Sequence, residues 1–159
     1  MIIRKYSTLL ASLFVFAACT QDKESPQISI VEEVPTSAPM IKRNKAPENA
    51  NVYFISPKAN AIVTNPVEVK FGVTNMEIVP SGQNSPMTGH HHIIIDADLP
   101  NMSFPIPANE NYVHFGDGST ETILNLSQGE HSLQLILGDY LHVPHTPAVY
   151  SEKITITVE

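Results

Sequence analysis

The chain has 159 residues, no tryptophan and a formal net charge of -7 at pH 7 with histidine counted as neutral. This length suits one domain with appended segments, whose core must come from Val, Ile, Leu and Phe. From Asn51 onward the only basic residues are Lys58, Lys70 and Lys153, and acidic residues outnumber them. Such a surface repels phosphate groups, which argues against nucleic acid and anionic lipid headgroups as partners and suits a cationic ligand.

Residues 1–18 predict a lipoprotein signal peptide. Arg4 and Lys5 form a positive start, and residues 9–16 form an apolar run too short to span a membrane as a mature helix. The sequence Phe-Ala-Ala-Cys that ends at Cys19 resembles the bacterial lipobox, with Phe in place of the usual Leu. The resemblance implies a lipid on Cys19, and Thr20 after it follows the pattern of sorting to the outer membrane. The alternative is an ordinary signal peptide with an incidental cysteine.

We therefore expect an exported protein, anchored by a lipid at Cys19 to the bacterial outer membrane, with its domain in the periplasm or at the cell surface. Because Cys19 is the only cysteine, its lipidation leaves no thiol for disulfides or metal binding. Residues 19–50 are mostly polar and predict a disordered tether, with a reach of about 30 Å. A short apolar patch at 28–31 offers an alternative edge strand.

From residue 51 to 159 the pattern changes to short strands. Residues 52–56 form one, and the alternation of Val67, Val69, Phe71 and Val73 with polar residues predicts a half-buried second one. Further strands are expected at about 90–97, 119–126, 131–138 and 152–158, with one more within 103–113. No helix is predicted after the signal peptide. The layout predicts an all-β domain and resembles an immunoglobulin-like antiparallel β-sandwich of about seven strands.

Five short motifs follow one another in a fixed order through this region. They are VYFISP at 52–57, TGHHH at 88–92, HFG at 114–116, GEH at 129–131, and LGD with HVPH within 137–145. By these motifs residues 50–158 resemble an exported bacterial family catalogued as domain of unknown function 4399. Asp117 departs from the glycine expected after the third motif. The resemblance implies a family but no activity, because none is established for it.

All seven histidines lie between His90 and His145. In a sandwich of this type the second, fourth and sixth connections between strands gather at one end. Six histidines should therefore converge there: His90, His91, His92, His114, His142 and His145. Strand alternation places His90 and His92 on one face and turns His91 toward the core with Ile93 and Ile95.

Neutral imidazole is the commonest transition-metal ligand, and three or four rings complete a site. The expected ligands of a copper or zinc ion are His90, His92, His114, His142 and His145. Further candidates are His91, Met76, Asp139, Asp96 and His131. A thioether favours Cu(I), so copper precedes zinc as the expected metal. His131 begins a strand at the opposite end, and its simpler interpretation is a cap at the edge of the core.

The leading hypothesis is a membrane-anchored metal-binding protein that serves metal acquisition, delivery or resistance, and a role without catalysis is favoured over an enzyme. A metal-dependent enzyme is the first alternative, with Glu130 or Asp139 as general base. Residues 114–117 resemble part of copper and zinc superoxide dismutase, but the cysteine pair of that enzyme is missing. The second alternative is a metal-free immunoglobulin-like binding or scaffold module. No protein partner is predicted.

Overall fold

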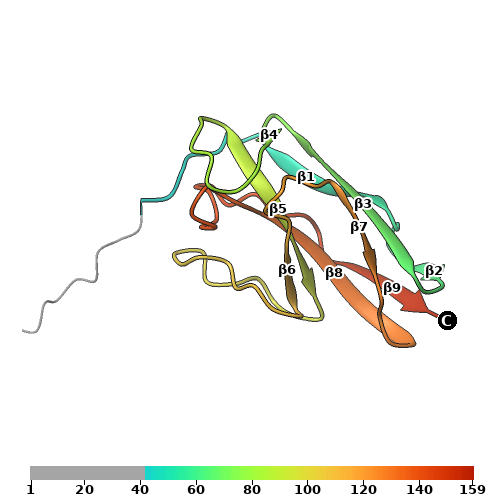
Figure 1. Ribbon diagram of the computed structural model, residues 1–159. Helices are drawn as coiled ribbons and strands as arrows, with labels where there is room; N and C mark the ends of the chain where they lie inside the picture. The colour runs from blue at the N-terminus through green and yellow to red at the C-terminus, as the bar shows by residue number, and fades with distance from the viewer. Residues whose placement is uncertain (1–41) are drawn as a thin grey trace, which may run out of the picture. The chain divides into compact units, whose positions relative to one another are not determined.

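The computed structural model describes residues 42–159 (Figure 1). The predicted signal peptide, the lipidation site at Cys19, the apolar patch at 28–31 and most of the predicted tether lie outside the described residues. Within residues 42–159 there is no helix with the length and apolar character needed to cross a membrane.

Residues 42–159 form nine strands in two sheets. They are β1 (Asn51–Ser56), β2 (Ala61–Val63), β3 (Val67–Thr74), β4 (Glu77–Ile78), β5 (Thr88–Ile95), β6 (Tyr112–His114), β7 (Glu121–Leu124), β8 (Gly129–Gly138) and β9 (Ile154–Val158). One sheet has the order β1-β3-β7, and the other has the order β2-β9-β8-β5-β4 with β6 paired to β5. The all-β prediction is confirmed.

The details of the sheets differ from the predicted layout. Two very short strands, β2 and β4, add to the expected number, and both pair in parallel with a neighbour. The expected strand within 103–113 is reduced to the three residues of β6, because the segment before it is rich in proline and lacks alternation. The large sheet is therefore mixed rather than purely antiparallel.

The main core lies between the two sheets. Buried residues of β3, namely Val67, Val69 and Phe71, alternate with exposed ones, as the period of two in the sequence predicted. They join one apolar cluster with Leu133 and Leu135 of β8. Each such side chain contributes about 1.5–3 kcal/mol by leaving water, so this cluster holds the two sheets together.

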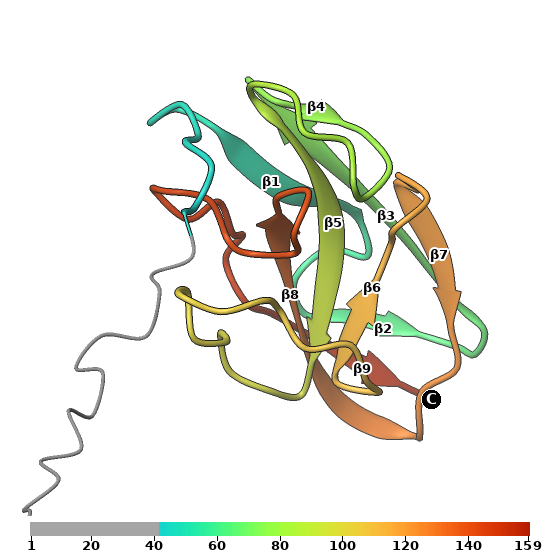
Figure 2. The ribbon, with the colours of Figure 1, turned by 60° about the vertical axis from the view of Figure 1, so that its left-hand side comes forward.

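Strand β5 is buried along its whole length. Figure 2 shows it crossing the centre of the domain between β8 and β6, and both pairings are antiparallel. Its outer face carries Ile94, which packs with Ile106 of the irregular segment between β5 and β6 and with Ile136 of β8. Side chains on both faces of β5 are thus shielded from water.

The folded body begins before β1. Ala46 donates a backbone hydrogen bond to the carbonyl of Thr146, and Thr146 donates one to the carbonyl of Asn44. Asn44 and Ala46 belong to the segment that the sequence predicted to be a tether. Residues 43–46 instead lie against the loop between β8 and β9.

Candidate metal centre

The central position of β5 determines where the histidine triplet points. His91 faces the main core, where its ring meets Phe71 edge-on with centroids 4.6 Å apart. His90 and His92 face the other side of the sheet. All three rings are almost completely buried, because other parts of the fold cover both faces of β5.

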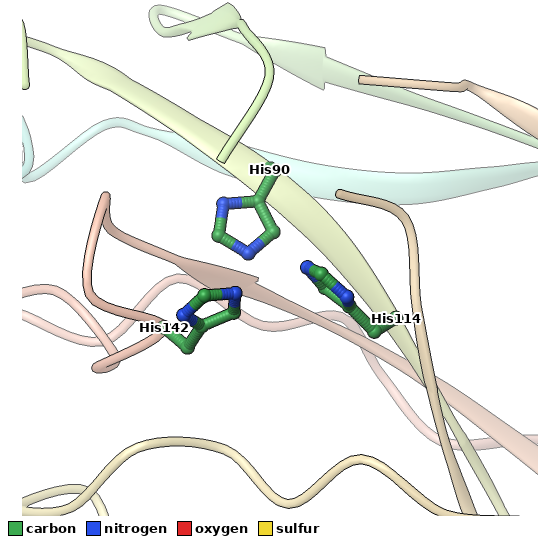
Figure 3. A group of neighbouring side chains, drawn as sticks. All are labelled: His90, His114 and His142. Atoms are coloured by element: carbon green, nitrogen blue, oxygen red, sulfur yellow. The ribbon is translucent and has the colours of Figure 1, made fainter. Parts of the chain in front are cut away.

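Two further histidines reach His90 and His92 from other segments. His114 ends β6 and is paired with His92 across the sheet. His142 lies in the loop after β8, whose last residue, Gly138, is paired with His90. Figure 3 shows the rings of His90, His114 and His142 turned toward a common centre from three different elements.

The four rings form a compact group, the histidine cluster: His90, His92, His114 and His142. The centroid of His90 lies 5.0 Å from those of His92 and His114 and 4.9 Å from that of His142. The centroid of His114 lies 4.9 Å from that of His92 and 4.7 Å from that of His142. The widest pair, His92 and His142, is 6.1 Å apart.

Ring nitrogens within this cluster are spaced for a single ion. One ligand nitrogen from each of His90, His114 and His142 lies within 4.8 Å of the others. The Nε2 atoms of His90 and His92 are 3.1 Å apart. Two imidazoles on one tetrahedral ion, at 2.0–2.1 Å each, hold their nitrogens about 3.3 Å apart. His90 and His92 therefore already have nearly the spacing of two ligands.

Burial favours the neutral form of His90, His92 and His114. Burial and, to a smaller extent, the neighbouring imidazoles together lower the pKa of His92 to about 2 and that of His90 to about 3. The pKa of His114 is also lowered by burial and by His142, against the opposing effect of Asp117. Neutral imidazole is the form that binds metals, so these rings need to release no proton at pH 7.

Two buried ring nitrogens of the cluster have no hydrogen-bond partner. These are Nδ1 of His92 and Nε2 of His114. An unpartnered buried polar atom costs about 1–3 kcal/mol, which natural folds rarely tolerate without a reason. A cation bound to Nε2 of His114 would give that nitrogen the partner that it lacks.

His145 lies close to the cluster but is used differently. Its ring is fully buried, and Nε2 donates a hydrogen bond to the carbonyl of Thr88 at 3.0 Å. This bond fixes the tautomer and leaves Nδ1 as an unpartnered acceptor. Gly89 makes room for this ring, because a Cβ there would lie 3.0 Å from Cε1 of His145. His145 thus packs beside the cluster.

Asp139 shapes the loop that presents His142. Its Oδ1 accepts hydrogen bonds from the backbone of Leu141 at 2.9 Å and of Val143 at 3.0 Å. Its Oδ2 accepts one from the backbone of Asn44 at 3.3 Å. The carboxylate is completely buried and occupied by these bonds. It holds the loop and does not belong to the histidine cluster.

The remaining candidates lie elsewhere. His131 and Glu130 lie near the start of β8, whereas His90 is paired with its last residue, about 25 Å away at the rise of an extended strand. His131 Nδ1 instead lies 2.6 Å from Oδ2 of Asp96. Met76 packs at the edge of the main core. The structure does not bring these four residues to the cluster.

The His131–Asp96 pair gives a pH-dependent contribution to folding. The hydrogen bond to Asp96 raises the pKa of His131 above its ordinary 6.5. Burial by itself would raise the pKa of Asp96, but hydrogen bonds from His131 and Ser132 lower that pKa below 3.8. The raised pKa of His131 adds stability below pH 6.5 that is lost as pH rises. The lowered pKa of Asp96 adds stability above pH 3.8 that is lost as pH falls.

We expect Asp96→Asn to destabilise the protein by at most about 1 kcal/mol at pH 6, because Asp96 is partly exposed. The loss should shrink as the pH is raised to 8.5, because His131 loses its proton as the pH rises. Urea unfolding at both pH values measures it, with Asp98→Asn as a control for the loss of a nearby charge. An equal loss at the two pH values would contradict the assignment.

Two glycines that the sequence analysis overlooked make room for the cluster. A Cβ on Gly116 would overlap Cε1 of His114 and lie 2.9 Å from its Nε2. A Cβ on Gly138 would lie 3.1 Å from Nε2 of His92 and 3.2 Å from Cα of His142. The motifs HFG and LGD contain these glycines, and the signal that could have identified them is their position beside a candidate ligand.

We expect Gly116→Ala to weaken metal binding at least tenfold while the free energy of unfolding changes by less than about 1 kcal/mol. The half-buried ring of His114 can swing away from the new methyl group, so the fold survives and one ligand is displaced. Calorimetric titration with Cu(II) and urea unfolding measure the two effects. Gly82→Ala is the control for backbone strain alone, because a Cβ there would meet nothing while its φ of +84° disfavours alanine; it should lose stability and keep its affinity. Unchanged affinity in Gly116→Ala would refute this role.

Comparison with known proteins identifies a family. Residues 69–159 match the model of a family described as Domain of unknown function (DUF4399). The match runs from β3 to the last strand and contains every residue of the histidine cluster. The searches of curated proteins and of solved structures gave no match. The family match covers more than half of the chain and confirms the resemblance found from the motifs, so the chain belongs to the DUF4399 family.

Proposed function

We propose that the protein is a metal-binding lipoprotein that holds one copper or zinc ion in the histidine cluster. Its role is metal acquisition, delivery or resistance at the cell envelope. The observation that carries the proposal is the convergence of four imidazoles from β5, β6 and the loop after β8, with one ring nitrogen each of His90, His114 and His142 within 4.8 Å of the others.

The chemistry of the donor set favours late first-row metals. The four donors are imidazole nitrogens, and the only cysteine of the chain, Cys19, lies far outside this region of the sequence. Imidazole suits copper, zinc and nickel, and carboxylate-poor sites do not favour calcium or magnesium. Copper binds such donors more tightly than zinc, which keeps it the first expectation.

The proposal also includes the location of the protein at the cell envelope. A lipid on Cys19 would anchor the protein to the outer membrane, with the domain in the periplasm or at the cell surface. There the polar stretch that follows Cys19 would let the domain meet its metal away from the bilayer. Radiolabelled palmitate incorporation in the bacterium tests the anchor, since a Cys19→Ser variant should lose the label.

Fewer observations support the alternative of a metal-dependent enzyme. The two general bases suggested by the sequence are unavailable, since Glu130 is at the far end of β8 and the carboxylate of Asp139 is occupied by backbone hydrogen bonds. A metal-binding role without catalysis requires neither residue.

Metal uptake by the purified protein tests the proposal. After removal of bound metal, the wild type should take up about one equivalent of Cu(II) or Zn(II) by elemental analysis and calorimetry. The double variant His90→Ala/His142→Ala should take up none. His131→Gln, a histidine outside the cluster, serves as the matched control and should bind as the wild type does. Equal uptake by the wild type and the double variant would refute the proposal.

A further inference from the structure

A short segment before β1, residues 43–46, runs along the loop that carries His142; we call it the strap. Lys45 and Thr146 form a parallel bridge, flanked by the backbone hydrogen bonds from Ala46 to Thr146 and from Thr146 to Asn44. Figure 2 shows this segment, in cyan, beside the red loop between β8 and β9. The strap therefore adds a strand-like edge to the loop.

Arg43 makes the strongest contacts of the strap. Its Nε donates a hydrogen bond to the carbonyl of Pro144 at 2.7 Å, and its Nη2 donates one to the carbonyl of His145. A planar guanidinium can hold two successive carbonyls in this way because its donors form a rigid fork. Hydrogen bonds from a charged donor are about twice as strong as neutral ones. Both carbonyls lie within three residues of His142.

The strap also holds the other side of the loop. The backbone N–H of Asn44 bonds to the Asp139 carboxylate, which in turn holds the N–H groups of Leu141 and Val143 on either side of His142. The loop is thus tied to the strap both before and after His142.

His142 needs such support. Its φ is +66°, in the left-handed region that a histidine enters at a cost of about 1–2 kcal/mol. Its carbonyl accepts a hydrogen bond from the backbone of Ile106, and its N–H donates to the carbonyl of Asp139. A strained residue persists only where its surroundings hold it, and a metal ligand must be held within about 0.5 Å of its place.

We propose that Arg43 is a positioning residue of the metal centre, which acts by holding the His142 loop in its ligand geometry. The inference rests on the proposed function, because it assigns a role at the same site. It also implies that the metal centre extends into the chain before β1, so that a domain cut at Asn51 would bind metal more weakly.

The test compares the Cu(II) affinity of two charge-matched variants of the purified protein. Arg43→Gln removes the guanidinium fork and should weaken Cu(II) binding at least tenfold. Lys45→Gln removes one positive charge from the same strap. The Lys45 side chain makes no hydrogen bond within residues 42–159, so the Cu(II) affinity of this variant should stay within twofold of the wild type. Arg43→Lys keeps the charge and part of the donor set, and should recover part of the affinity.

A double-mutant cycle separates positioning from general stability. In the His142→Ala background, Arg43→Gln should change the affinity less than twofold, because the residue it positions is gone. A purely structural role would instead lower the melting temperature and leave the dissociation constant of the folded protein unchanged. The nitrogen couplings in the electron paramagnetic resonance spectrum of bound Cu(II) should also fall by one ligand in Arg43→Gln.

The outcomes distinguish the two proposals. A wild type that binds neither Cu(II) nor Zn(II) contradicts the proposed function and the strap together. A wild type that binds Cu(II), with equal affinities in Arg43→Gln and Lys45→Gln, overturns the role of Arg43 alone. An effect of Arg43→Gln that persists in the His142→Ala background also overturns it, since the strap would then act through another residue.

Discussion

The metal-free protein is expected to unfold as the pH falls from 6.5 toward 3. Burial lowers the pKa of His90 to about 3, of His91 to about 4 and of His92 to about 2, and neighbouring histidines contribute at His90 and His92. These rings stay neutral in the fold but become protonated below pH 6.5 in the unfolded chain. A lowered histidine pKa therefore adds stability that is complete above pH 6.5 and lost as the pH falls.

The expected effect is large. With three protons taken up only on unfolding, the free energy of unfolding falls by about 4 kcal/mol for each pH unit once the pH is well below 6.5. A domain of this size has about 5–15 kcal/mol to lose. Dividing this stability by the slope places the midpoint of acid unfolding between about pH 3 and pH 5.

Circular dichroism during an acid titration measures this midpoint. His91→Leu is the informative variant, because it removes one of the three protons and both unpartnered ring nitrogens of His91. Its pH dependence should be weaker by about a third, and its stability at pH 7.5 should rise by about 1–3 kcal/mol. A wild type that keeps its native spectrum at pH 2.5 would contradict the expectation.

Metal binding should raise the melting temperature by about 15 °C, provided that the free metal is about a thousandfold above the dissociation constant. Ligand in that excess stabilises the folded state by about 4 kcal/mol, which for a domain of this size corresponds to such a shift. His90→Gln should lose the shift, because the ring of His90 lies within 5.0 Å, between centroids, of the three other rings of the cluster.

Calorimetric melting with and without Zn(II) measures the shift and avoids copper-driven oxidation. His131→Gln should keep the full shift, since His131 is bonded to Asp96 at the far end of β8. Excess chelator should reverse it in both proteins. A shift of equal size in His90→Gln would place the metal elsewhere on the protein.

The sequence by itself determined the class of fold and the faces of the strand on which the three consecutive histidines lie. The period of two around Val67, Val69 and Phe71 is a local signal, because neighbouring side chains of a strand point to opposite faces. The same alternation separated His91 from His90 and His92, as the structure has them. The family, too, was recognisable from short motifs in a fixed order.

Only the tertiary structure decided which histidines meet and what surrounds them. His114 reaches His92 through the pairing of β6 with β5, and His142 reaches His90 through the end of β8, contacts between residues far apart in sequence. Side-chain alternation carries no information on such pairings, on the clearance that Gly116 provides, or on the bonds from Arg43. The ligand set depends on these long-range contacts, so it emerged only when the chain was folded.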